Sequence, residues 1–318
     1  MTPRRTLTTL LVAFVILVAS ARAVTDRVIE KTFATHAGAI VHADTFSGSI
    51  HVTASGDTKV HVSVRQTVGA DDDKAARALL AELEIVLRQT NDWGVHLEIT
   101  PHRHVRWVWQ NWSPAALAIE IAVPPRCRLE LRTGEGAITV DSIAGNISAT
   151  TASGTIFIGE IDGAIAAANG HGDISVTAVT GGLSLTAKSG NILIGRSDGT
   201  ATLAAVDGVI DVQAARGPVL ARGDRSDITV GFVHPLREPS ALETDGGDVT
   251  VCLDPRSGVS LDARSSKLGT VRIRNLEFTA AKGTPHKSAF VGTLNGGGPL
   301  VKIRAGGGNA RINGVPSI

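Results

Sequence analysis

The chain has 318 residues and a nearly balanced charge, with 31 Lys and Arg residues against 30 Asp and Glu residues. A hydrophobic content of 43% at low net charge excludes intrinsic disorder, 35 glycines are too few for collagen, and the lack of a basic surplus argues against nucleic acid as a main partner. Aromatic residues make up only 3%, whereas Gly, Val, Ile, Ala and Thr are abundant, which favours many short β-strands joined by tight turns.

Residues 1–23 have the pattern of a secretory signal peptide. Arg4 and Arg5 form a basic start, an apolar run follows, and Ala21-Arg22-Ala23 offers a small-x-small cleavage pattern. The run is shorter than the roughly 20 residues that span a bilayer. We therefore predict an exported protein (periplasmic, at the cell surface or extracellular) with no membrane span after cleavage. An uncleaved anchor is the alternative.

Residues 24–126 are expected to form the first strands and a cap. After an acidic start at Asp72, apolar residues at intervals of four predict one helix over about residues 72–88. They are Ala75, Leu79, Leu83 and Leu87. Strands are expected at about 95–100, 105–109 and 117–123.

The segment 102–112 contains three of the four tryptophans and a local basic surplus. One interpretation is a hydrophobic cluster that closes one end of the fold. The other is a stacking platform for sugar rings or a contact for an envelope partner. The candidate ligand contacts are Arg103, Arg106, Trp107, Trp109 and Trp112. His102 and His104 nearby are interpreted as solvated or hydrogen-bonded histidines and not as metal ligands.

A nine-residue repeat organises the middle of the chain. Gly recurs ten consecutive times at this spacing between Gly136 and Gly217, and Ser226 takes the eleventh position. Apolar residues two and four places after each Gly, with a small polar residue between them most often, predict a half-buried strand. Ile143, Ile161 and Val179 recur at eighteen residues, which indicates that one coil contains two nine-residue halves.

Stacked coils of this kind predict an all-β, right-handed parallel β-solenoid over residues 127–318, because a lone coil cannot bury its apolar face. The Gly-rich segment 298–312 is expected to be one last coil. The interval between Cys127 and Cys252 corresponds to about seven coils, too far for a disulfide. We expect two free thiols in buried or nearly buried positions.

The "SG-x-I-x-V" units carry a resemblance to a known family. They are Ser153-Gly154-Thr155-Ile156-Phe157-Ile158, Gly172-Asp173-Ile174-Ser175-Val176 and Ser189-Gly190-Asn191-Ile192-Leu193-Ile194. With strands and one helix before them and a Gly-rich closing coil after them, they resemble the putative-adhesin family of exported bacterial domains, related to auto-transporter-adhesin head domains. The resemblance covers nearly all of the chain after residue 23. It implies a β-solenoid of unknown function with no established catalytic residues.

Motifs of catalysis and metal binding have structural explanations here. Gly195-Arg196-Ser197-Asp198-Gly199 matches the nucleophile-elbow pattern, but a strand follows where the elbow needs a helix. The nonapeptides lack the recurring Asp of calcium-binding repeats. A polysaccharide-degrading β-helix enzyme would need carboxylates clustered on one outer face. The outward acids instead occupy scattered positions of the repeat and do not stack on adjacent coils.

We therefore expect a non-enzymatic envelope protein without cofactor or metal. Its flat outer faces, rich in Thr, Ser and Ala, would bind a glycan or a protein. The alternative is a structural scaffold that self-associates through the ends of the solenoid or supports an envelope complex.

Overall fold

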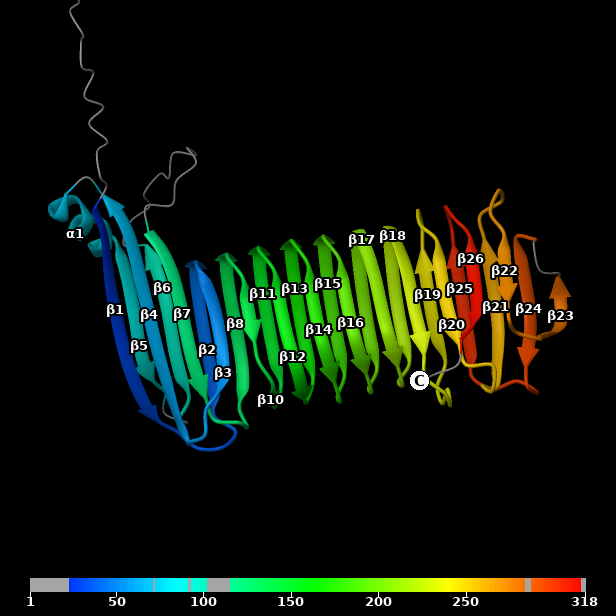
Figure 1. Ribbon diagram of the computed structural model, residues 1–318, viewed down its shortest axis with the longest axis horizontal. Helices are drawn as coiled ribbons and strands as arrows, with labels where there is room; N and C mark the ends of the chain where they lie inside the picture. Colours follow the sequence, from blue (N-terminus) through cyan, green and yellow to red (C-terminus); the bar gives the residue numbers. More distant parts are fainter. Residues whose placement is uncertain (1–22, 71, 91–92, 102–114, 284–286, 316–318) are drawn as a thin grey trace, which may run out of the picture.

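The computed structural model describes residues 23–70, 72–90, 93–101, 115–283 and 287–315, and it is an all-β structure with one helix (Figure 1). The N-terminal elements are β1 (Ala23–Ala34), β2 (Ile40–Ser47), β3 (Ser49–Ala54), β4 (Lys59–Ala70), α1 (Asp73–Ala81), β5 (Leu83–Gln89), β6 (Val95–Pro101), β7 (Ala115–Val123), β8 (Arg128–Glu135) and β9 (Ile138–Val140). The middle contains β10 (Ile143–Ala144), β11 (Ile147–Ser153), β12 (Ile156–Asp162), β13 (Ile165–His171), β14 (Ile174–Val179), β15 (Leu183–Ser189), β16 (Ile192–Ser197), β17 (Ala201–Ala215) and β18 (Val219–Phe232). The C-terminal elements are β19 (Ser240–Thr244), β20 (Val249–Leu253), β21 (Val259–Ser265), β22 (Val271–Arg274), β23 (Thr279–Gly283), β24 (Ala289–Leu294), β25 (Leu300–Ala305) and β26 (Ala310–Gly314).

The predicted interval of eighteen residues is confirmed by the strand pairing. β11, β13 and β15 pair in parallel, so that Ile147, Ile165 and Leu183 lie in line. β12, β14 and β16 pair in the same way, and the start and end of β17 extend the two rows. Each coil thus contributes one strand to a first face, which contains β11, β13 and β15, and one to a second face, which contains β12, β14 and β16.

Alternation along each strand separates core from surface. In β15 the burial pattern places Leu183, Leu185 and Ala187 inside and the residues between them outside. The inward side chains of both faces form one continuous core cluster that runs from Phe33 to Ile312. Stacking is therefore what buries the apolar half of each strand, as the repeat requires.

Short polar side chains at the turns link each coil to the next. The Oδ1 of Asn146 accepts a hydrogen bond from the backbone N–H of Ala164 at 3.0 Å. Asp173 accepts one from Asn191 at 2.7 Å, and Asn191 accepts one from Val209 at 3.0 Å. Each side chain satisfies an amide eighteen residues ahead, so these residues act as bridges between coils as well as turn formers.

The repeat glycines are required where two coils approach closely. Gly190 has φ +134°, and an added Cβ would lie 2.5 Å from the carbonyl carbon of Gly172 in the preceding coil and closer still to its oxygen. A side chain at this position would therefore separate neighbouring coils.

The sheet is mixed and not purely parallel as predicted, because antiparallel strands occur at both ends. β1 pairs antiparallel with β4, β4 with β7, and β5 with β6. Near the other end, β24 pairs antiparallel with β21 and β23. At the N-terminal end, β2 pairs with β6 and β8, and β3 pairs with β7 and β9. The β2–β8 pairing crosses the boundary predicted at residues 126 and 127.

The predicted helix over residues 72–88 is wrong in its second half. α1 begins after Asp72, whose side chain accepts a hydrogen bond from the Ala75 N–H at 2.7 Å, and it ends at Ala81. The following residues form β5 instead and cover the edge of β6. An interval of four places Leu83 and Leu87 on the same side in a helix and in a strand alike, so the spacing did not distinguish the two. The predicted strands at 95–100 and 117–123 are confirmed as β6 and β7, and the one at 105–109 lies outside the described residues.

The Gly-rich C-terminal segment forms a coil, but it is not the last one in space. β25 pairs with β19 on one side and with β21 on the other. β26 lies in the same way between β20 and β22. Figure 1 shows these red strands between the yellow and the orange ones. The outer strands β21 and β22 therefore come earlier in the sequence than β25 and β26, which separate them from β19 and β20.

Both cysteines are free, Cys127 buried and Cys252 half-buried, as predicted. Burial raises the pKa of the Cys127 thiol to about 12, and burial followed by the nearby Asp211 raises the pKa of Cys252. Among the described residues, no helix is long and apolar enough to cross a membrane. The predicted signal peptide lies almost wholly outside the described residues, and β1 begins at Ala23.

Candidate functional site

The tryptophan segment was predicted to be either a ligand contact or part of an end cap. Residues 102–114 lie outside the described residues, and with them Arg103, Arg106, Trp107, Trp109 and Trp112. His102 and His104 fall in the same segment. The role of these residues stays a prediction.

The middle of the first face is a flat surface of short side chains. In β11, β13, β15 and β17 the outward residues form two neighbouring rows across the strands. One row contains Ser148, Ala166, Ser184 and Thr202, and the other contains Thr150, Ala168, Thr186 and Ala204. None of these eight residues is charged, and none is longer than threonine. We call this surface the flat face.

An open groove of about 560 Å³ runs along the flat face. It crosses the start of all four strands and is lined by the row of Ser148, Ser184 and Thr202 together with the turn residues before it. Arg128 lies at one end of the groove, 3.1 Å from Glu130. Because the groove is open and its lining spans four neighbouring strands, it suits an extended ligand better than a small compact one.

On the second face, two large apolar side chains are exposed among small ones. Phe157 is 45% exposed and Leu193 is 39% exposed. Ser175 lies between them in the same row, and Thr139 flanks Phe157 on the other side. Val206, Val209 and Leu220 on the described middle strands are exposed to a similar degree, and Leu220 extends the row of Ser184 and Thr202 on the first face.

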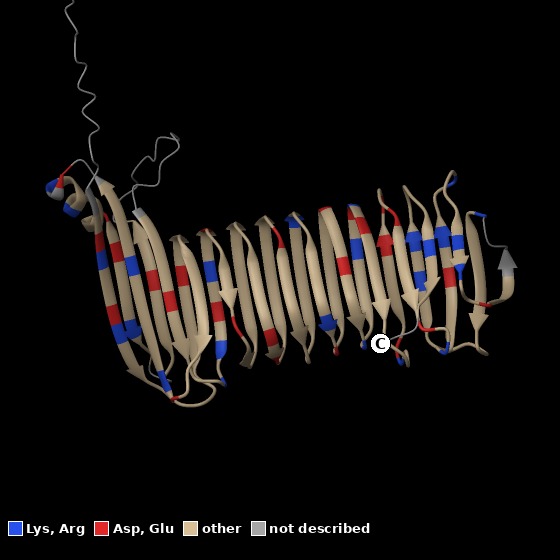
Figure 2. Ribbon diagram, viewed as in Figure 1, with Lys and Arg blue, Asp and Glu red and all other residues tan. Residues whose placement is uncertain are grey.

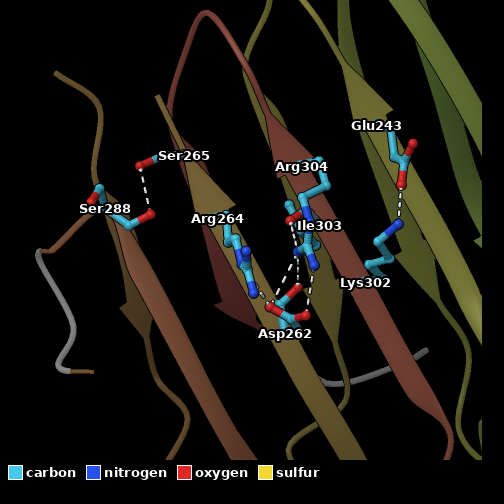
Figure 3. Close-up of polar contacts among 8 residues, drawn as sticks. All are labelled: Glu243, Asp262, Arg264, Ser265, Ser288, Lys302, Ile303 and Arg304. Atoms are coloured by element: carbon cyan, nitrogen blue, oxygen red, sulfur yellow. Dashed lines mark hydrogen bonds and ion pairs between the residues drawn. The ribbon is translucent and has the colours of Figure 1, made fainter. Parts of the chain in front are cut away.

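Beyond the flat face, the first face becomes strongly charged. In Figure 3, Arg304 on β25 reaches across to Asp262 on β21 and forms two hydrogen bonds of 2.6 and 3.2 Å with its carboxylate. Arg264 lies 3.6 Å from the same carboxylate, and Lys302 pairs with Glu243 on β19 at 2.5 Å. The bond from Arg304 holds the pKa of Asp262 below its usual range, and the bond from Lys302 does the same for Glu243.

Such cross-coil ion pairs were missed by sequence reasoning. Arg225 forms two hydrogen bonds with Asp207, eighteen residues before it, and Arg216 lies 3.6 Å from Asp198, again eighteen residues before it. Asp198 and Asp207 thus stack on basic residues of the next coil and not on other acids. Opposite charges at the interval of one coil are the sequence signal that would have found these pairs.

The nucleophile-elbow motif is structural. Ser197 is fully buried at the end of β16, and its hydroxyl donates a hydrogen bond to the carbonyl of Gly199 at 3.2 Å. A buried hydroxyl held by the backbone cannot reach a substrate in solvent, so Ser197 is not a nucleophile.

Two outward histidines, His51 and His61, lie against acids on the second face. His51 is 3.4 Å from Asp141, and His61 is 3.1 Å from Asp57 and 3.0 Å from Thr32. Across the part of the chain that the structure describes, no three His, Cys, Asp or Glu residues come together in a way that could hold a metal ion.

No protein-family model and no curated protein matches the chain. Among solved structures, it is similar to a putative adhesin from Bacteroides fragilis NCTC 9343 at 14% identity over 90% of this chain and 97% of that chain, with a TM-score of 0.37. A putative lipid binding protein from Parabacteroides distasonis ATCC 8503 is 13% identical over 90% and 96%, with a TM-score of 0.44. A putative adhesin from the same organism is 10% identical over 91% and 97%, with a TM-score of 0.42. The adhesin descriptions match the family that the sequence resembles, and the function is argued below from this chain's own residues.

Proposed function

We propose that this chain is a non-enzymatic binding module of the cell envelope and that its flat face holds an extended ligand, either a glycan or a protein surface. The observation that carries the proposal is the double row of uncharged Ser, Thr and Ala side chains along the open groove. The proposal includes export through residues 1–23 and the assignment of the repeat as a right-handed β-solenoid.

The physical argument concerns order and repetition. Strands in one face are about 4.8 Å apart, so equivalent hydroxyl groups recur at short, regular intervals along the long axis. Ser, Thr and Ala have few rotamers, so little side-chain entropy is lost when a ligand covers them. A polymer with its own repeat can make the same contact from one coil to the next.

Co-sedimentation with insoluble envelope polysaccharides tests this proposal. We expect saturable pelleting of the purified protein, and we expect Ser184→Gln with Thr202→Gln to weaken it by covering the groove with longer side chains. Ser175→Gln on the second face is the matched control, because it adds the same side chain to an outward strand position elsewhere. Equal pelleting of the unaltered protein, the double variant and the Ser175→Gln control would show that the flat face does not bind the polysaccharide.

The tryptophan segment has its own variant in the same assay. Changing Trp107, Trp109 and Trp112 to Ala lowers pelleting without loss of stability if these residues form a sugar platform. A fall in thermal stability of the variant would instead identify them as part of the end cap.

A scaffold that assembles end to end is the second candidate. In the described chain, β1, β5, β22 and β23 each pair with one strand, which leaves an edge of each for another copy. Filaments that grow with protein concentration in sedimentation velocity would favour this role. A monomer at all concentrations would exclude it.

A further inference from the structure

The loop between β21 and β22 exposes an apolar side chain completely. Leu268 is 100% exposed, whereas the other exposed large apolar residues of the described chain range from 38% to 55%. Lys267 directly before it is also exposed. The whole apolar surface of this side chain therefore lies in water, where it is available to an apolar partner.

Backbone hydrogen bonds hold the base of this loop. The Gly269 N–H donates to the carbonyl of Ser266 at 3.1 Å, and the Ser266 N–H donates to Gly308 at 3.3 Å. The Val271 N–H donates to the carbonyl of Lys287 at 2.8 Å. Leu268 is therefore presented at the tip of a short anchored turn, and not on a long free segment.

Cations surround the base of the loop. Lys267 and Lys287 are exposed and have no ion pair among the described residues. Arg272 donates a hydrogen bond to Thr270 at 3.2 Å, and Arg264, at the end of β21, shares the carboxylate of Asp262 with Arg304. Arg264, Lys267 and Arg272 thus lie within four residues of Leu268 in the sequence. Lys287 joins them because its carbonyl accepts the hydrogen bond from Val271.

The loop belongs to the basic end of the molecule. Residues 240–314 contain ten Lys and Arg against six Asp and Glu, whereas residues 136–215 contain two against seven. Figure 2 shows the same contrast, with blue bands gathered over β21, β22, β25 and β26. Opposite charge would therefore be drawn to this end and repelled from the middle strands.

We propose that the Leu268 loop and its cations are a peripheral contact site for an anionic lipid bilayer. An apolar side chain that enters the acyl boundary and basic side chains that meet anionic headgroups are the two parts of interfacial membrane binding, and each supplies what the other lacks. An acidic glycan would use the same cations, but it would leave Leu268 in water. Leu268 thus favours the bilayer over a soluble polyanion.

Vesicle co-sedimentation tests the proposal with the full chain. We expect binding to phosphatidylglycerol–phosphatidylcholine vesicles at low salt, no binding to pure phosphatidylcholine, and weaker binding as salt rises. Leu268→Ser should weaken binding to the mixed vesicles about tenfold. Lys267→Gln and Lys287→Gln should each weaken it about fivefold.

Two matched controls separate this site from the rest of the surface. Leu300→Ser removes another exposed leucine, on β25, and Lys188→Gln removes an exposed cation from the middle of the molecule. Both should bind vesicles like the unaltered protein.

Failure to bind anionic vesicles overturns the proposal. So does equal binding of Leu268→Ser and the unaltered protein, which would assign the cations to a soluble polyanion such as an acidic glycan. The vesicles contain no glycan, and the Ser184 and Thr202 variants leave this loop intact. The outcome is therefore independent of the function proposed for the flat face.

Discussion

Replacing Gly190 by Ala is the sharpest test of how the coils stack. Gly190 has φ +134°, where L-residues are strained, and its amide donates a hydrogen bond to the carbonyl of Asp207 at 3.0 Å. An added Cβ would also lie 3.2 Å from the backbone nitrogen of Asp173, in addition to its overlap with the carbonyl of Gly172. The substitution therefore combines a backbone penalty with a steric one.

The two penalties can be estimated separately. A residue other than Gly in such a backbone region costs about 1–3 kcal/mol. Forcing an extra carbon into a packed contact costs about another 1–3 kcal/mol. Ala has less conformational entropy than Gly in the unfolded chain, and this stabilises the variant by roughly 0.4–1 kcal/mol. We expect Gly190→Ala to lower the free energy of unfolding by about 3 kcal/mol.

Gly182→Ala is the matched control, because Gly182 directly precedes β15 and Gly190 directly follows it. Gly182 does not have a positive φ, and an added Cβ would meet only the carbonyl oxygen of Thr200, at 3.9 Å. The free energy of unfolding of the Gly182→Ala variant should stay within about 0.5 kcal/mol of that of the unaltered protein or rise slightly. Urea unfolding followed by circular dichroism measures both variants. Equal midpoints for Gly190→Ala and Gly182→Ala would refute the view that close approach between coils requires glycine.

Three further predictions concern the core, the thiols and the charged end. Ile174 is fully buried, so Ile174→Ala should lower the free energy of unfolding by about 2–5 kcal/mol in urea titrations, and a smaller loss would mean that the column repacks. Burial raises the pKa of the Cys127 thiol to about 12, so Cys127 should stay unmodified by a thiol reagent at pH 8 in the folded protein. The half-buried Cys252 should react first. Early labelling of Cys127 in peptide maps would contradict its burial. The pKa of Asp262 is lowered by the bond from Arg304, so the carboxylate stabilises the fold above its unfolded pKa of about 3.9, and this contribution is lost as pH falls through the lower folded value. Asp262→Asn should therefore cost about 1 kcal/mol at neutral pH and nothing in strong acid, and a pH-independent cost in thermal melts would exclude the ion pair as its cause.

The candidate site was only partly predictable. The flat face follows from the small residue between two apolar positions in each repeat, such as Ser184 between Leu183 and Leu185. The exposure of Leu268 could not be inferred, because an isolated leucine in a loop has the same sequence signature whether it is buried or not. The charge pairs of Asp198 and Asp207 could have been found by applying the interval of eighteen to polar residues. The pairs of Arg304 and Lys302 join residues 42 and 59 apart, and no repeat interval predicts them.

The amino-acid sequence by itself determined the repeat, the eighteen-residue register and the inward or outward direction of most side chains in the middle of the chain. These properties are local and periodic: each coil meets a neighbour that carries the same pattern, so one rule predicts every contact. The ends follow no such rule. Residues 83–89 form a strand where the spacing predicted a helix, and β25 and β26 lie between strands that precede them in the chain. Both outcomes depend on which distant strand edge is left unpaired. Edge pairing joins residues that are 61 apart, as in Ser240 and Val301. Only the tertiary structure decides such pairings, because the hydrogen bonds and buried area that select them do not exist until both partners are in place.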